Sequence, residues 1–280
     1  MTTAITKLQT GVQLTELELM IMEEAESEEN AFDMIPTRIT IAPGGINQFS
    51  SSDGETMKEI TAIVAVSQKA RAYWPGKGSD QSPLCTSPDG VHGNFALAPT
   101  KGQLQDAVNH RAVHPAIRLY DEQREFPDFF DCASCPLAQW GSADAGNGQA
   151  CKSMRRLVIF VDGWVAPALL TLPPTSVKAW DIYCSALKNK RSGYFAVRSK
   201  LSLEKAKSAG GDPYSIISVQ VAGALTASEV QAVMELRRQF AEYVRELPIE
   251  AGDYVTVDGS TQTVDPETGE IHSDASQIPF

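Results

Sequence analysis

Four of the five cysteines in the chain lie within, or at the edges of, one irregular segment. Cys132 and Cys135 form a CxxC pair, Cys151 follows after 15 intervening residues, and 46 residues separate Cys85 from the pair. A CxxC turn places two sulfurs at one corner of a tetrahedron, and two further soft ligands complete a structural zinc site. We therefore expect Zn²⁺ as a structural cofactor bound by Cys85, Cys132, Cys135 and Cys151.

Other interpretations of these thiols stay open. His92 or His114 could replace Cys85 as the fourth ligand, and the cysteines could instead be buried free thiols or a redox pair. A redox CxxC normally sits at a helix N-terminus near a βαβ unit, whereas Pro136 and the Gly-rich sequence after it indicate a loop. The fifth cysteine, Cys184, falls in a predicted helix and is expected to be a core thiol.

The segment that carries the four cysteines has no regular hydrophobic periodicity. Between about 75 and 150 it is rich in Gly, Pro, Ser, Asn and Asp. A structureless insert of this length is improbable in a compact domain unless something holds it together. Metal binding would supply the folding free energy that its low apolar content cannot. We therefore predict a zinc-ribbon-like loop over about 75–154.

Aromatic residues next to basic ones suggest a surface for single-stranded nucleic acid, because aromatic rings stack bases and cations follow phosphates. Alternate strand positions would place Tyr194, Arg198 and Lys200 on one face. Val197 and Leu201 would then be buried, together with Phe195. Core packing is the alternative for each single aromatic residue. The candidate nucleic-acid-binding residues are Arg71, Tyr73, Trp74, Trp140, Lys152, Arg155, Arg156, Tyr194, Arg198 and Lys200.

Motifs of enzymatic chemistry are missing from the sequence. It contains no GxxxxGK[ST], no GxSxG and no HExxH. His110 and His114 are four residues apart, but no third ligand accompanies them and no helix is predicted there. We expect a protein that is not an enzyme.

Charge is distributed in blocks along the 280 residues, although the net charge is −11. Residues 1–33 contain eight acids and one base, and residues 246–280 contain eight acids and neither Lys nor Arg. The stretch between them has 23 bases and 19 acids. Acidic ends are usually solvated tails. They can also compete with nucleic acid for a basic surface.

Membrane insertion and export are not expected. The longest apolar runs, such as Leu157–Val161, are strand-sized. The N-terminus lacks a basic segment followed by an apolar one. Five cysteines are an odd and sparse set for a secreted disulfide framework. We expect a cytoplasmic protein, with no membrane partner.

Secondary structure is predicted from periodicity and turn residues. A helix over about 177–188 would have Ser176 as its N-cap. A second helix would open with a capping box at Thr226 and Glu229 and run to Leu247. Its apolar stripe would comprise Val230, Val233, Met234, Phe240, Ala241, Val244 and Leu247. Strands are predicted at 35–42, 60–66 continuing toward 71–74, 155–161, 165–172, 194–203 and 214–222, with Asp162-Gly163 joining the third and fourth as a hairpin.

These elements predict a mainly β fold with α (α+β). Short strands, one helix between strands and an irregular insert fit a five-stranded OB-like barrel, as well as other small barrels and α+β sandwiches. A C-terminal helix would follow the barrel. The domains would be an acidic N-terminal segment at 1–33, a DNA-binding body at 34–247, and a disordered acidic tail at 248–280.

The last residues, Ile278-Pro279-Phe280 with Asp274 upstream, resemble the C-terminal tip of bacterial single-stranded DNA-binding proteins. Gln277 stands where that family has an Asp before the Ile. In that family the terminal Phe and its carboxylate are captured by replication, recombination and repair proteins. The resemblance implies that Asp274, Ile278, Pro279 and Phe280 bind such partners.

The body is similar to phage-type single-stranded DNA-binding proteins, in which an OB fold carries a zinc-binding loop. The similarity covers about 58–222 and rests on the segments KEITAIVAVSQKARAYW, CASCPLAQWGS and GQACK. It implies that the strands and the cysteine loop together line a DNA cleft.

The expected function is therefore sequence-nonspecific binding of single-stranded DNA in replication and recombination, in the cytoplasm of a bacterial host, with partner proteins recruited by the tail. The alternative is a zinc-stabilised protein-interaction module, virion- or transcription-associated, that binds no DNA. The sequence leaves open the oligomeric state, the preference for DNA over RNA, and any annealing activity.

Overall fold

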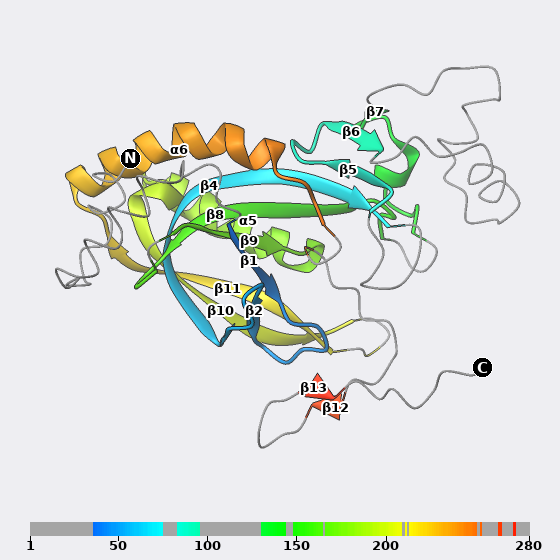
Figure 1. Ribbon diagram of the computed structural model, residues 1–280, viewed down its shortest axis with the longest axis horizontal. Helices are drawn as coiled ribbons and strands as arrows, with labels where there is room; N and C mark the ends of the chain where they lie inside the picture. Colours follow the sequence, from blue (N-terminus) through cyan, green and yellow to red (C-terminus); the bar gives the residue numbers. More distant parts are fainter. Residues whose placement is uncertain are drawn as a thin grey trace, which may run out of the picture.

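The computed structural model describes the folded body and two short strands beyond it (Figure 1). The acidic segment 1–33 and the terminal residues Asp274, Ile278, Pro279 and Phe280 lie outside the described residues. So do His110 and His114. The described residues are 36–74, 83–95, 130–143, 148–164, 166–208, 211, 213–250, 253, 263–264 and 271–272.

Eleven strands of the described residues form one curled sheet shaped like half a barrel (Figure 1). Its main path runs β3-β2-β1-β9-β8-β4-β5-β6-β7, and β10 joins β4 on one side and β11 on the other. The strands are β1 (Thr37–Ile41), β2 (Phe49–Ser51), β3 (Thr56–Met57), β4 (Glu59–Tyr73), β5 (Cys85–Ser87), β6 (His92–Phe95), β7 (Phe130–Asp131), β8 (Lys152–Val161), β9 (Ala168–Leu172), β10 (Val197–Lys207) and β11 (Pro213–Ala224). A separate pair joins β12 (Thr263–Val264) to β13 (Ile271–His272).

Strand β4 organises the sheet because it pairs with three others. It lies antiparallel to β8 over most of its 15 residues, to β10 near its start and to β5 at its end. The pairing with β8 shifts register between Val64 and Val66, where the strand bends. The predicted hairpin is confirmed: β8 and β9 pair antiparallel around Asp162 and Gly163, whose φ of +86° suits glycine.

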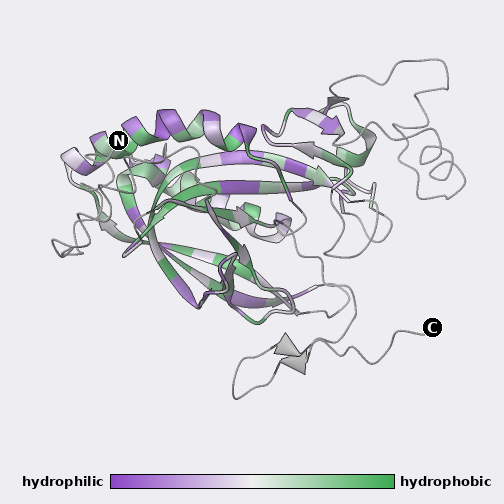
Figure 2. Cartoon of the chain, in the orientation of Figure 1, coloured by the Kyte–Doolittle hydropathy of each residue, from purple (hydrophilic) through white to green (hydrophobic). Residues whose placement is uncertain are grey.

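Two long helices pack on opposite faces of this sheet (Figure 1). Helix α5 (Pro174–Asn189) contributes Trp180, Tyr183 and Leu187 to the larger core, and helix α6 (Ala227–Glu246) covers the other face. The run Leu157–Val161 is continuous in apolar residues because its side chains alternate between the two cores. Figure 2 shows the mixed hydrophilic and hydrophobic residues that an amphipathic α6 requires.

Of the two predicted helix N-caps, one is confirmed and the other is wrong. The capping box of α6 is confirmed, since the Thr226 hydroxyl accepts a hydrogen bond from the Glu229 backbone and the Glu229 carboxylate accepts one from the Thr226 backbone. The predicted N-cap Ser176 is wrong, because α5 already begins at Pro174. Ser176 is buried instead, and its hydroxyl accepts a hydrogen bond from the Ile217 backbone N–H at 3.1 Å.

Packed residues continue past residue 248, where the acidic tail is predicted to begin. Ile249 is buried against Ala70, Ala72 and Met154, and Asp253 is buried beside Arg38. The chain therefore stays attached to the sheet after α6 ends.

The predicted α+β class is confirmed by this arrangement of one sheet and two long helices. None of the helices in the described part of the chain is both long and apolar enough to cross a membrane.

Candidate nucleic-acid interface

The four cysteines of the insert line one small cavity of about 20 Å³ at the far end of β4. Cys85 begins β5, Cys132 and Cys135 lie in the turn after β7, and Cys151 directly precedes β8. Leu137, from the short 3₁₀ helix η1 (Pro136–Ala138), closes the cluster. The sequence spacing thus correctly indicated that these cysteines come together.

The predicted zinc site is nevertheless wrong. Among the described residues, no group of three or more His, Cys, Asp or Glu side chains is arranged to hold a metal ion, and all the cysteines are free thiols. Burial raises the pKa of Cys151 to about 12, and burial with the neighbouring thiols raises that of Cys85 still further. Metal ligation requires thiolates. Cys85, Cys135 and Cys151 instead pack with Tyr73 and Leu137 in a small apolar cluster.

Hydrogen bonds fix the described turns around the cysteines. The Asp131 carboxylate accepts hydrogen bonds from the backbone N–H groups of Ala133 and Ser134, which forms the CxxC turn. The Cys132 N–H donates to the Val91 carbonyl at 2.8 Å, and the Cys151 N–H donates to the Leu137 carbonyl at 2.9 Å. Side-chain to backbone bonds of this kind define turns without a metal.

The turn between β5 and β6 depends on one carboxylate. Asp89 accepts hydrogen bonds from the backbone N–H groups of Val91 and His92, both at 2.8 Å, and from the Ser87 hydroxyl at 3.0 Å, and it lies 2.7 Å from the His92 ring. Partial burial acts to raise its pKa, but these bonds together place the pKa of Asp89 below its usual range.

We expect Asp89→Asn to loosen this turn at neutral pH. A carboxylate whose pKa is lower in the folded than in the unfolded protein stabilises the fold at pH values above the unfolded pKa of about 4. This stabilisation is lost as the pH falls toward the folded pKa. In wild type, protection of peptides covering 83–95 in hydrogen-exchange mass spectrometry should therefore fall from pH 7 to pH 3, after correction for intrinsic rates. In the variant, protection should be about tenfold lower at pH 7 and change less with pH.

The control for this prediction is Glu235→Gln, which removes one charge from an exposed position on α6. It should leave protection of 83–95 as in wild type. Equal pH dependence in wild type and Asp89→Asn would show that this carboxylate does not hold the turn.

Most of the predicted nucleic-acid-binding residues are engaged within the fold. Arg156, predicted to contact phosphate, is fully buried, with 0% of its surface exposed, and its guanidinium bonds to backbone carbonyls within the fold. Tyr73 is buried in the cysteine cluster, and Trp74 packs on Ala70 and its neighbours. The Lys152 ammonium donates to the Gln149 carbonyl at 2.9 Å.

The predicted face of Tyr194, Arg198 and Lys200 also differs from the structure. Tyr194 lies in the 3₁₀ helix η2 (Tyr194–Ala196) before β10, where it packs on Trp180 and under the Arg237 guanidinium. Arg198 and Lys200 do share the outer face of β10, and Val197 and Leu201 are buried behind them as predicted. Both cations are paired, Arg198 with Asp162 and Glu229, and Lys200 with Glu59 at 2.8 Å.

Two of the predicted residues, Arg71 and Trp140, lie on an open groove of about 910 Å³. Trp140 has 79% of its surface exposed. One side of the groove is formed by α5, so it is called here the α5 groove. Its lining includes Arg71, Trp140, Ser153, Lys178, Asp181 and Ile182.

The charge of the α5 groove is positive among its described lining residues. Arg71 and Lys178 are its cations, and the one carboxylate, Asp181, is paired with Arg155 at 2.9 Å. Sequence reasoning missed Lys178 and Ile182. Ile182 itself could have indicated this surface, because it is an apolar residue on the hydrophilic side of the predicted helix. In the structure, Ile182 is 59% exposed.

Comparison with known proteins gives no match to a protein-family model, to a curated protein or to a solved structure.

Proposed function

We propose that this protein binds single-stranded DNA without sequence preference and acts, without catalysis, in replication or recombination in a bacterial cytoplasm. The observation that carries the proposal is Trp140, an almost fully exposed indole on the rim of a groove whose cations are Arg71 and Lys178. Exposed aromatic rings beside cations are the features that hold single strands, because every base has a face to stack and every nucleotide carries a phosphate.

The strand order supports this function. Five consecutive neighbours, β11-β10-β4-β8-β9, are antiparallel, and α5 connects β9 to β10. A five-stranded OB-like barrel, open between β9 and β11, would have this order. In OB folds the loop between the first two strands contributes to oligonucleotide binding. Here that loop runs from β4 to β8 and carries Trp140.

Helix α6 affects where DNA would lie. It covers Val158 and Phe160 of β8 and Leu169 of β9, the sheet face on which OB folds often bind ligands. Strand binding would then depend on the loop side and on the α5 groove. The C-terminal Ile278-Pro279-Phe280, through its resemblance to the bacterial tip, would recruit replication and recombination proteins.

A protein-interaction role is the second candidate, and the exposed Ile182 favours it. An apolar side chain that is 59% exposed inside a groove suits a protein ligand as well as a base. Under this alternative the body would bind no DNA.

The test is an anisotropy titration of labelled oligo-dT with the full chain. We expect saturable binding that weakens about sevenfold between about 50 and about 200 mM NaCl, as two phosphate contacts on a single strand predict. A duplex of the same length should bind more weakly. Absence of binding at the lower salt concentration would contradict the proposed function and favour the protein-interaction role.

A further inference from the structure

Among the described residues, one guanidinium nitrogen of Arg71, a residue that lines the α5 groove, has no hydrogen-bond partner. Its Nη1 is buried and has no hydrogen-bond acceptor among the described residues. The residue lines both the cysteine cavity and the α5 groove, and its side chain hydrogen-bonds Cys151. A buried donor without an acceptor costs free energy, and such a group in a native structure calls for an explanation. An anion entering the groove would provide one.

The α5 side of the groove favours an anion too. Lys178 is exposed there, and no carboxylate pairs with it among the described residues. The first turn of α5 contains no acid, and Pro173 at the N-cap offers no side chain to its N–H groups. The partial positive charge of this helix end adds to that of Lys178.

An apolar surface accompanies these cations. Trp140 lies on the cysteine loop, and Ile182, one turn after Lys178, lies on α5. A planar base can stack on the indole while Ile182 covers apolar surface of the same nucleotide. The volume of about 910 Å³ lies at the upper end of the ~300–1,000 Å³ range of ligand sites, so a nucleotide and the following phosphate have room.

We propose that the α5 groove binds one nucleotide unit of single-stranded DNA, with its base on Trp140 and its phosphate between Arg71 and Lys178. The occupant is argued from charge complementarity and from the exposed aromatic ring. This inference rests on the proposed function and places the DNA-binding site on a surface away from the face that α6 covers. It assigns DNA contacts to Lys178 and Ile182 and excludes Arg156.

The experiment compares variants of the full chain in the oligo-dT titration. Trp140→Ala should weaken binding about tenfold or more, the size expected for one lost stacked base, and Trp140→Phe should recover part of it. Lys178→Gln should reduce the slope of log affinity against log salt by about 0.7. Lys188→Gln is the matched control, because Lys188 is an exposed lysine on the same helix that does not line the groove.

A second readout follows the indole directly. Tryptophan fluorescence should be quenched by oligo-dT in wild type, and most of this quenching should be lost in Trp140→Phe while binding persists. Urea unfolding midpoints equal to wild type would show that the variants are folded.

The outcomes separate the two proposals. If wild type binds no oligo-dT, the proposed function fails, and this inference fails with it. If wild type binds and Trp140→Ala, Lys178→Gln and Lys188→Gln all bind equally well, the proposed function stands and the groove is not the site.

Discussion

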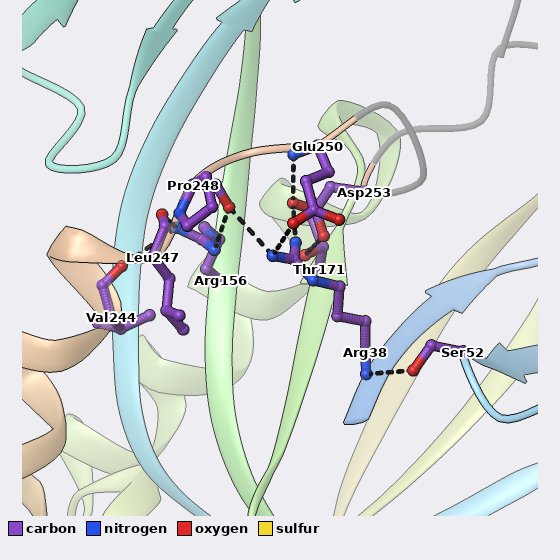
Figure 3. A network of polar contacts seen from close by, with 9 residues as sticks. All are labelled: Arg38, Ser52, Arg156, Thr171, Val244, Leu247, Pro248, Glu250 and Asp253. Atoms are coloured by element: carbon purple, nitrogen blue, oxygen red, sulfur yellow. Dashed lines mark hydrogen bonds and ion pairs between the residues drawn. The ribbon is translucent and has the colours of Figure 1, made fainter. Parts of the chain in front are cut away.

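Replacing Arg156 with alanine should lower the free energy of unfolding by about 3 kcal/mol or more. Arg156 is fully buried and donates three hydrogen bonds (Figure 3): Nη1 to the carbonyls of Val244 and Leu247, at 3.1 and 2.8 Å, and Nη2 to that of Pro248, at 3.1 Å. These carbonyls lie in the last turn of α6 and just after it, where backbone acceptors lack partners within the helix. Without the guanidinium, the carbonyls of Val244 and Leu247 lose this donor, whereas that of Pro248 keeps a hydrogen bond from Arg38 at 3.3 Å.

Burial also opposes this arrangement. Burial lowers the pKa of Arg156 to about 10, so the guanidinium stays protonated at neutral pH and its desolvation costs free energy. Removing the side chain relieves that cost, which is why we expect a smaller loss than the sum of three charged hydrogen bonds. Urea denaturation followed by circular dichroism measures the difference.

Two variants make the Arg156 prediction specific. Arg156→Lys keeps the charge but cannot reach three carbonyls with a planar fork, so an intermediate loss of about 1–2 kcal/mol is expected. Arg155→Ala is the matched control, since the preceding residue points to the other side of β8 and pairs with Asp181, whose side chain is 49% exposed. Arg155 is itself largely buried, but Asp181 stays in contact with water without it, so a smaller loss of about 1–2 kcal/mol is expected. Equal losses for Arg155→Ala and Arg156→Ala would overturn this assignment.

The same pair of arginines shows where sequence reasoning fails. Arg155 and Arg156 stand next to an aromatic-rich loop, and their type alone indicates a phosphate contact. The strand alternation turns Arg156 toward the end of α6, a helix that starts 71 residues later in the sequence. No local pattern encodes that contact, because the acceptors are backbone carbonyls of any residue type.

Sequence patterns correctly predicted the features that depend only on neighbouring residues. The hairpin at Asp162-Gly163 and the capping box at Thr226 need only neighbouring residues, and both are confirmed. The apolar run Leu157–Val161 correctly indicated a strand, and the structure adds that this strand is buried on both faces. The short strands β2, β3, β5, β6 and β7 were not predicted, since two to four residues carry too little periodicity.

The cysteines illustrate a spacing that predicts proximity but not chemistry. The four thiols do meet, because β4, β5 and β8 bring Cys85 and Cys151 to the same end of the sheet as the CxxC turn. The turn is shaped by Asp131 rather than by a metal, and Tyr73 and Leu137 fill the space around the sulfurs. Asp131, directly before Cys132, was the sequence signal for that turn.

The second large effect is expected at Asp253, which holds the chain after α6. Its side chain is 1% exposed and pairs with Arg38 at 2.6 Å, and it accepts hydrogen bonds from the Glu250 backbone N–H and the Thr171 hydroxyl (Figure 3). Asp253→Asn leaves the Arg38 guanidinium, itself only 12% exposed, without its buried countercharge. Removing one member of a buried pair typically costs about 3–5 kcal/mol. The amide can keep part of the hydrogen bonding, so about 2–4 kcal/mol is expected in urea denaturation.

The chain provides a close control, because Glu250 pairs with the same guanidinium at 2.9 Å but is 57% exposed. Glu250→Gln should therefore cost no more than about 0.5 kcal/mol, as exposed ion pairs do. If both substitutions cost the same, burial of Asp253 does not anchor this segment.

The position of Asp253 also decides where a chain without the tail should end. A chain that ends after Glu250 would lose the Arg38–Asp253 pair along with the tail, so DNA binding without the tail should be measured on a chain that ends after Asp253.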